Sequence, residues 1–338
     1  MPSKIITNGR LEYLEATIDV TYPDIGKVTY RGSQPIMVSN QWTPPAKVYT
    51  DCLTFTGKES DFTLNATNKT WDGTLEWSTD HSTWTTLSGT EAIQSAGKKL
   101  YLRGKSNTTF YANYKSVKWV LSKKADCDSN IQTLLDWENP PTSIPTNSCY
   151  KDMFRNCVNL TRAPELPATI LAKECYKQMF WGCTSLTTAP KLPATTLADE
   201  CYYFMFYGCT NLTTAPELPA TTLADWCYTM MFSGCTNLTS APELPATTLA
   251  DRCYGDMFKN CTNLTSAPEL PATTLKKQCY ENMFAYCSKL KVNVTSGNKI
   301  FTCPSIIPND FAVNNMFDST GGEFIGTPVV GTTYYWTE

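Results

Sequence analysis

Apolar residues recur with a fixed period of 26 between residues 149 and 290. The copies begin at Cys149, Cys175, Cys201, Cys227, Cys253 and Cys279. The unit reads C-Y-x-x-M-F-x-x-C-x-x-L-T-x-A-P-x-L-P-A-T-T-L-A-x-x, with five full copies over 149–278 and a sixth that breaks off after Leu290. A fixed period of about 20–50 residues predicts a solenoid, because one unit cannot bury its apolar face alone and stacks on its neighbours.

The first half of each unit predicts a short helix. In the fourth copy, the positions i, i+3, i+4 and i+7 are occupied by Tyr228, Met231, Phe232 and Cys235. This is the spacing of one helix face. Asp225 stands just before it, where an N-cap residue is expected, and Asp199 and Asp251 match it in the neighbouring copies.

The second half of each unit predicts a short strand and two turns. Leu238 to Ala241 form the strand, Pro242 ends it, and Pro245 forces another turn. Leu249 then returns the chain to the core. Stacked copies would place these strands in a narrow parallel ladder.

Cysteine usage follows the repeat, because twelve of the fifteen cysteines belong to it. The two cysteines of a unit are eight residues apart and no C-x-x-C occurs, so the spacing of a zinc site is absent. Equivalent cysteines of adjacent coils could come within disulfide reach. Their Cβ directions would run parallel, however, which favours a ladder of free buried thiols.

Residues 47–124 predict a small β-sandwich. Short alternating runs such as LTFTG, DFTLNA and KKLYLRG are separated by Gly, Asn, Asp and Ser, which is typical of such a domain. EWSTDHSTW predicts a hairpin with His81, the only histidine, at its tip. A solvated turn residue is the favoured interpretation of His81 over a ligand.

Three further segments flank these domains. Residues 1–46 predict a separate attachment segment with strands in LEYLEATIDVTY and KVTYRG, or alternatively an extra strand pair on the sandwich. Residues 125–148, with Ile131, Leu134 and Leu135 in a short helix, are placed to cap the first coil, as solenoids require. Residues 292–338 predict a second cap, in which FAVNNMF echoes the repeat and GEFIG and TTYYWTE form strands.

The motif M-F-x-x-C-x-x-L-T-x-A-P-x-L-P-A-T-T-L-A-x-x-C-Y resembles the BspA-like leucine-rich repeats of gut bacteria and their phages. The resemblance covers residues 149–290, and the predicted solenoid spans residues 149–291. It implies a right-handed solenoid, a role in adhesion or recognition, and no catalytic residues. The preceding domain resembles the immunoglobulin-like module that often stands before such repeats. The expected fold is therefore multidomain, with a small all-β immunoglobulin-like sandwich followed by an α/β leucine-rich-repeat solenoid with N- and C-terminal caps.

Charge and hydropathy exclude several classes of partner. The formal net charge is −3 with 17% charged residues, whereas a nucleic-acid surface would show a basic stripe. No run reaches the roughly 18 apolar residues of a membrane span, so we expect no membrane insertion. The start lacks the regions of a signal peptide. We expect either that the protein is made and used without export or that the chain begins after processing.

No residue pattern predicts catalysis. A Ser/His/Asp triad would need His81, nothing near it supports one, and no Gly-rich phosphate loop occurs. Four glutamates stand between the two prolines of their copies, and Lys191 interrupts this row; they are Glu165, Glu217, Glu243 and Glu269. A solvated edge is favoured over a calcium site for them. We expect no enzyme, no cofactor and no bound metal.

Positions that vary between copies are where a partner could be recognised. On the outward face of the predicted helices, the end copies carry charges and the middle copies carry large apolar residues. Stacking would gather the latter into one patch of Trp181, Tyr203, Phe204, Tyr207, Trp226 and Met230. Exposed apolar patches with polar rims mark binding surfaces, and Tyr and Trp dominate interface hot spots. Self-association, packing within the chain and simple exposure remain alternatives.

These patterns favour a non-enzymatic protein on the virion surface, of fibre or decoration type, carried by a phage of gut bacteria. Its N-terminal segment would contact other virion proteins, and its solenoid would bind a glycan or protein of the host surface or mucosa. A bacterial cell-surface adhesin and a purely structural decoration protein, the latter a homo-oligomer, are the alternatives.

Overall fold

The computed structural model describes residues 18–22, 26–30, 52–305 and 311–337. They belong to two compact units, Met1–Thr50 and Asp51–Glu338, which we describe separately. In the first unit, strands β1 (Ile18–Tyr22) and β2 (Gly26–Tyr30) form an antiparallel hairpin, as the sequence predicts. The rest of the predicted attachment segment lies outside the described residues.

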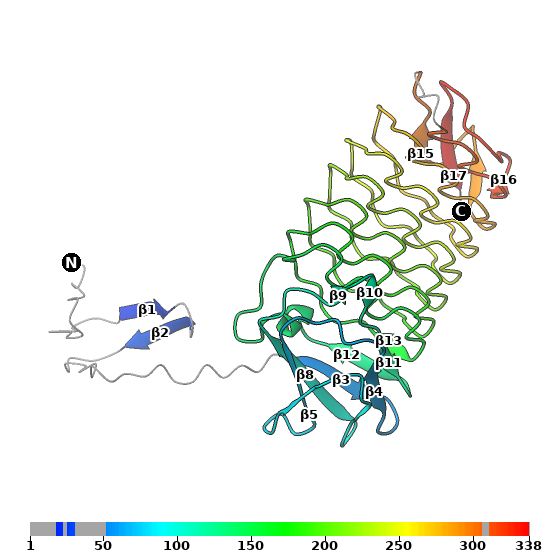
Figure 1. The fold of residues 1–338 in the computed structure, drawn as a ribbon. Coiled ribbons are helices and arrows are strands. Elements are labelled where there is room, and N and C mark those ends of the chain that lie inside the picture. Colours follow the sequence, from blue (N-terminus) through cyan, green and yellow to red (C-terminus); the bar gives the residue numbers. More distant parts are fainter. Residues whose placement is uncertain (1–17, 23–25, 31–51, 306–310, 338) are drawn as a thin grey trace. The chain divides into compact units, whose positions relative to one another are not determined.

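The second unit begins with a small β domain (Figure 1). Its larger sheet has the order β13-β12-β3-β8-β5-β6, its smaller sheet the order β11-β4-β7, and β9 pairs with β10. Side chains of both sheets, such as Phe55 and Leu64, are buried in one core. The strands are β3 (Leu53–Gly57), β4 (Thr63–Ala66), β5 (Thr74–Ser78), β6 (Thr85–Thr86), β7 (Ile93–Gln94), β8 (Lys99–Lys105), β9 (Tyr111–Ala112), β10 (Lys115–Ser116), β11 (Trp119–Leu121), β12 (Ala125–Asp128) and β13 (Leu160–Arg162). The likeness to an immunoglobulin-like module stays a prediction.

The repeats contain a chain of tight turns where the sequence predicted a helix. In the first copy, every second backbone amide from Lys151 to Cys157 donates to the carbonyl three residues earlier, at 2.8–3.2 Å. Ser148, Asp152 and Asn156 have positive φ values of 59°, 60° and 59°. An α-helix needs negative φ throughout, and a positive φ at the third position is that of a type II turn. The predicted helix is therefore wrong, and we call the observed segment a turn ribbon.

The same residue spacing fits both structures, which explains the error. A ribbon places residues in the apolar core in pairs, such as Cys149-Tyr150 and Met153-Phe154, and keeps the two residues between the pairs out of that core. Its period of four residues also yields the positions i, i+3, i+4 and i+7. Asp225 caps no helix, because its carbonyl and its carboxylate accept from the backbone amides of Glu200 and Asp251, both at 2.9 Å.

Backbone hydrogen bonds join each ribbon to the next. The amide of Phe180 donates to the carbonyl of Met205, and that of Phe206 donates to Met231, both at 2.9 Å. The other alternate residues do the same, so each coil is bonded to the next in one register, and the coils form the stack in Figure 1. The ribbons, numbered 1 to 7, are residues 148–157, 174–183, 200–209, 226–235, 252–261, 278–287 and 311–320.

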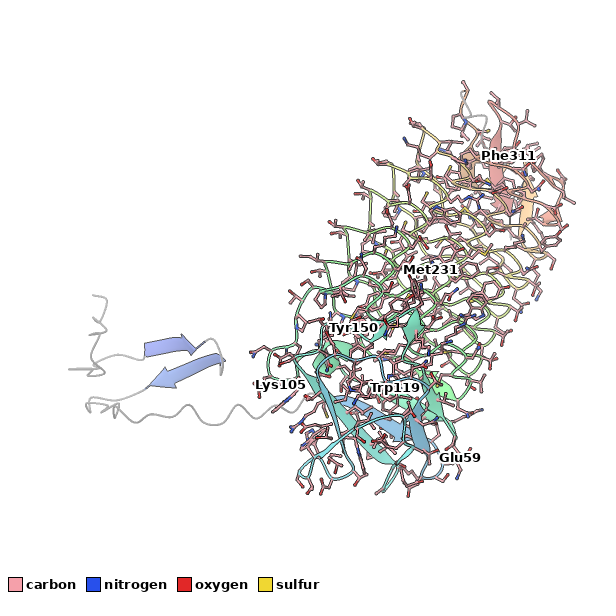
Figure 2. All side chains as sticks on the ribbon, in the orientation of Figure 1. Glu59, Lys105, Trp119, Tyr150, Met231 and Phe311 are labelled. Atoms are coloured by element: carbon pink, nitrogen blue, oxygen red, sulfur yellow. The ribbon has the colours of Figure 1, made fainter. Side chains whose placement is uncertain are left out.

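Like side chains stack on like along the core. The phenylalanine rings of successive ribbons lie parallel, and Phe206 is 5.5 Å from Phe180 and 5.6 Å from Phe232 between ring centroids. Tyrosines form a second row, with Tyr202 and Tyr228 5.7 Å apart. Figure 2 shows Tyr150 and Met231, both fully buried, within the stacked coils. The predicted core positions are thus confirmed.

Thiols form a third buried row. The thiol of Cys183 donates to the carbonyl of Phe154 at 3.0 Å, and Cys209 does the same to Phe180 at 3.1 Å. The twelve repeat cysteines are free and buried, as predicted. The second cysteine of ribbons 2 to 6 donates in this way to a phenylalanine carbonyl of the preceding coil.

A glycine closes the turn ribbon in the middle copies, and it provides a test of the ribbon. Gly208 has a φ of 68°, and an added Cβ would meet nothing within 4 Å. We expect Gly208→Ala to lower the free energy of unfolding by about 1–2 kcal/mol through backbone strain alone. Gly208→Asn should cost less, because asparagine tolerates positive φ and occupies the same position as Asn156 and Asn260. Urea unfolding of both variants measures this, and equal losses would contradict the left-handed conformation.

The predicted parallel ladder is present mostly as single bridges. Only the first copy has a strand, β13; farther along, Thr188 pairs with Thr214 and Ser240 with Ser266. A second row joins Thr196 to Thr222 and Thr222 to Thr248. Pro242 and its equivalents follow within two residues and lack an amide, so each strand stays short.

The β domain and the first coil share a sheet and a core. Strand β12, in the segment predicted as a cap, pairs antiparallel with β3 and parallel with β13 of the first copy. The backbone amides of Phe110 and Trp119 donate to Cys149 and Met153, as an earlier ribbon would. The predicted helix near Ile131 is the 3₁₀-helix η1 (Ile131–Leu134), fully buried. The described structure therefore shows no break at the predicted boundary after residue 124.

The repeat continues past the predicted end of the sixth copy. Residues 311–320 form ribbon 7, in which Phe317 stacks on Phe284 at 5.9 Å and positive φ recurs at Phe311, Asn315 and Ser319. A sheet of order β15-β17-β14-β16 lies beside it. Its strands are β14 (Lys291–Asn293), β15 (Asn298–Thr302), β16 (Gly321–Gly322) and β17 (Thr333–Thr337). FAVNNMF thus echoes the repeat because it forms the same ribbon.

Candidate ligand-binding surface

The six predicted patch residues occupy outward positions of ribbons 2 to 4. Trp181 belongs to ribbon 2, three residues belong to ribbon 3, and Trp226 and Met230 belong to ribbon 4. All six are half-buried; those of ribbon 3 are Tyr203, Phe204 and Tyr207. Tyr203 and Tyr207 share a face because they hold equivalent places in successive turns, and no helix is involved.

Three of these large side chains stand on left-handed backbone. Phe204, Trp226 and Met230 have φ values of 56°, 60° and 53°. A bulky residue with positive φ is an outlier and costs on the order of 1 kcal/mol or more relative to glycine. The same φ recurs at the equivalent positions of the other ribbons, for example 58° at Gln178 and 53° at Asp256, so it belongs to the turn and does not by itself mark a site.

The rings of ribbons 2 and 3 contact one another closely. Trp181 lies parallel to Phe204 with centroids 5.0 Å apart, and it meets Tyr207 at 4.8 Å. Phe204 also contacts Tyr207 at 5.3 Å and Tyr203 at 4.3 Å. These separations are those of favourable aromatic pairs.

A further contact extends the cluster to ribbon 4. Tyr203 meets Trp226 edge to face at 5.9 Å. We call Trp181, Tyr203, Phe204, Tyr207 and Trp226 the aromatic row. Met230 holds the position of Phe204 one coil later but has no ring to add. The structure thus brings five of the six predicted residues into one connected set.

Cations flank the aromatic row, which the sequence reasoning missed. Arg155 lies over Trp181 at 4.3 Å, and Arg252 lies over Trp226 at 4.5 Å. Lys177 lies 4.7 Å from the ring of Tyr203. In the sequence, these cations are indicated by the charged residues that occupy the equivalent ribbon positions in neighbouring copies. The row is therefore bounded at both ends by guanidinium groups in cation–π geometry.

Ion pairs fix Lys177 beside the row. Its ammonium lies 2.5 Å from Glu200 and 3.5 Å from Glu174. Burial opposes the charge of Lys177, but the hydrogen bond to Glu200 and the nearby carboxylates outweigh it, so the pKa of Lys177 is raised. Burial likewise opposes ionisation of Glu174, yet bonds from Lys151 and the charge of Lys177 lower its pKa. The cation is thus held charged next to Tyr203.

His81 packs on rings instead of standing free at a hairpin tip. It is half-buried, has a φ of 63°, and lies 4.8 Å from Tyr101 between ring centroids. Its backbone amide, and not its imidazole, bonds to the Ser78 hydroxyl at 2.9 Å. Backbone amides of Thr83 and Ser82 hold the pKa of the Asp80 carboxyl well below its usual range. These contacts build a turn, as predicted, although its histidine is less solvated than expected.

The acidic row is exposed, in agreement with the solvated-edge interpretation. Glu165, Glu217 and Glu243 face solvent, and Glu269 pairs with Lys299 at 2.8 Å. Among residues 52–305 and 311–337, no group of three metal-ligating side chains comes together. No helix in the described part of the chain could span a membrane.

Sequence reasoning also missed a pocket between the first two copies. It has a volume of about 660 Å³ and lies at their proline corners, away from the turn ribbons. Arg162 and Lys191 line it, and both depart from the consensus of the other copies. In the sequence, these two departures from the consensus are the features that could have indicated the pocket.

Stacked 26-residue coils with a leucine core and a short parallel ladder define a leucine-rich repeat region. Residues 147–291 match the family model of the BspA type leucine rich repeat region, in six copies. This part of the chain is a BspA-type leucine-rich repeat region, and such a region indicates a role in interaction or adhesion. No curated protein and no solved structure matches the chain.

Proposed function

We propose that this protein is a non-enzymatic recognition protein that binds a glycan or protein of a host surface or mucosa through the aromatic row. One observation carries the proposal. Five large rings from ribbons 2 to 4 form a connected, half-exposed set where the outer copies carry charges or small residues.

The energetics favour a partner for this row. Half-buried Trp and Tyr side chains retain apolar area that a partner can cover, and such residues dominate interface hot spots. Flat ring faces also suit the C–H faces of sugars. Ordering costs are small, because the rings already hold one another and Arg155 and Arg252 fix the ends.

Packing within the chain accounts less well for the row. Its ring and cation contacts, among the described residues, all lie within ribbons 1 to 5 and involve neither the β domain nor the C-terminal sheet. Self-association through the row is the competing proposal. The mass of the protein in solution, compared between wild type and row variants, separates a monomeric binder from an oligomer.

We propose further that the protein is carried on a phage virion, with Met1–Thr50 as the attachment unit. This unit forms its own compact body, and its place ahead of an immunoglobulin-like module and repeats resembles the module order of phage proteins. Mass spectrometry of purified particles from the source culture tests this proposal. Recovery only with cell envelopes would favour the bacterial adhesin instead.

The row is tested by residues that neighbouring copies already accommodate. Ser233 holds the position of Trp181 and Tyr207 in ribbon 4. We expect Trp181→Ser with Tyr207→Ser to reduce binding to host cells or mucin at least about tenfold, because two anchor rings are lost. Binding isotherms of the labelled protein measure this.

The control is Lys259→Ser, which makes the same replacement in ribbon 5 without touching a ring of the row. It should bind like wild type, and all proteins should keep the same circular dichroism. Unchanged binding by the double variant would exclude the aromatic row as the binding surface.

A further inference from the structure

The pocket between the first two copies has the dimensions of a small-molecule site. Its volume is about 660 Å³, within the range typical of ligand pockets. Its walls include Pro164 and Pro167 of the first copy and Pro190 and Pro193 of the second. Proline rings fix the backbone, so the pocket is formed by rigid corners and does not depend on a mobile loop.

The sequence of this face is nearly constant, and its departures fall in the pocket. The later copies carry Thr or Ser at the position of Arg162 and Glu at the position of Lys191. The strand pairing between coils also changes at the pocket. Thr188 pairs forward with Thr214, whereas Arg162 pairs backward with Asp126 of β12. The proline corners of copies one and two therefore face each other across a gap lined by two cations.

The charges of the pocket suit a carboxylate. Arg162 shares its guanidinium with Asp128 at 3.2 Å. Lys191 is exposed and has no ion pair within the described residues. Elsewhere on this face the same position is a glutamate. A ligand carboxylate would thus meet Lys191 and the free edge of Arg162, in charge-assisted hydrogen bonds.

The walls favour a compact ligand over an extended peptide. Four prolines line the pocket, and proline has no amide to pair with a peptide backbone. Thr169, Thr188 and Glu165 supply hydroxyl and carboxylate groups around the apolar floor of Leu166 and Ala163. Hydroxyl groups on a C–H-rich body match that combination of polar and apolar wall.

We propose that this pocket binds a carboxylate-bearing sugar, such as a uronic or sialic acid residue, with Lys191 and Arg162 holding the carboxylate and Glu165 accepting from a hydroxyl. The site is separate from the aromatic row, because it uses residues 162–169 and 188–193. It would give the solenoid a second specificity, for the charge of a glycan.

The experiment compares free glucuronic acid and N-acetylneuraminic acid with glucose, by ligand-observed NMR titration of the full chain. We expect one acidic sugar to bind and glucose to bind at least about tenfold more weakly. Arg162→Thr with Lys191→Glu restores the consensus of the later copies, so folding should be preserved. This variant should lose binding to the acidic sugar at least about tenfold.

Two controls keep the test specific. Ile170→Thr restores the consensus at a third departure in the first copy, outside the pocket lining, and should leave binding unchanged. Trp181→Ser with Tyr207→Ser removes the aromatic row and should also leave it unchanged. The proposal is overturned if wild type binds neither acid, if glucose binds equally, if the consensus variant still binds, or if the aromatic-row variant loses the acidic sugar.

Discussion

Replacing Phe206 by alanine is expected to lower the free energy of unfolding by about 3–5 kcal/mol, the usual cost of removing a buried ring. Phe206 is fully buried and lies between two parallel rings, Phe180 at 5.5 Å and Phe232 at 5.6 Å. Each coil contacts only its neighbours, so this change weakens both interfaces of one central coil. Chemical denaturation followed by circular dichroism measures the loss.

The same replacement two residues earlier provides the matched control. Phe204 belongs to the same ribbon but is half-exposed and contacts only the outer rings. Phe204→Ala should cost about 1–2 kcal/mol, because alanine keeps the same left-handed strain and only outer ring contacts are lost. Equal losses for the two variants would show that the ribbon does not separate a core face from an outer face.

Alkaline conditions are expected to unfold the repeat in the presence of reductant. Burial raises the pKa of six thiols from 9.0 to about 12, those of Cys149, Cys157, Cys201, Cys209, Cys261 and Cys279. The folded chain therefore holds these protons more tightly than the unfolded chain. Their stabilising contribution is complete below pH 9.0 and is lost as the pH rises toward about 12.

The expected loss of stability at alkaline pH is large enough to unfold the protein. Each thiol contributes a slope of about 1.4 kcal/mol per pH unit above its unfolded pKa, so six give on the order of 8 kcal/mol per unit. Domains of this kind are stable by roughly 5–15 kcal/mol, so unfolding should follow within about two pH units. Circular dichroism and thiolate absorbance, recorded together against pH, should change at the same point.

The control is the same titration in denaturant, where thiolates should form near their ordinary pKa of 9.0. Thiolate formation near that pH in a protein that still shows native circular dichroism would contradict the burial of the thiol row. A thiol reagent at neutral pH should likewise react rapidly only after denaturation, because burial and raised pKa both suppress the reactive thiolate.

The sequence predicted which residues are buried but not the backbone that buries them. Tyr228, Met231, Phe232 and Cys235 are core residues, as expected. Their spacing fits both a helix of period 3.6 and a ribbon of period 4, and the apolar positions alone do not distinguish the two. The recurrent Gly or Asn before the second cysteine, as at Gly234 and Asn260, indicates a left-handed position and would have favoured turns.

The candidate site could also be predicted only in part. Fixed register alone brought Trp181, Tyr203, Phe204, Tyr207 and Trp226 together, so stacking identical copies was enough to predict their contact. The cations over their rings depend on side-chain reach, which the pattern of apolar residues does not describe. The shared strand β12 was also missed, because ADCD carries no alternation that distinguishes a strand from a loop.

The register of backbone bonds between ribbons has a genetic consequence. Each coil offers its neighbour the same bonds that it receives, so a whole copy can be duplicated or lost by recombination without disturbing either end. Gaining a copy between ribbons 4 and 5 would lengthen the protein while leaving the aromatic row intact. Losing the second copy would remove Trp181 and Lys191 together. Duplication of a later copy would thus change length without removing a ring of the row, whereas loss of the second copy would change length and binding specificity together.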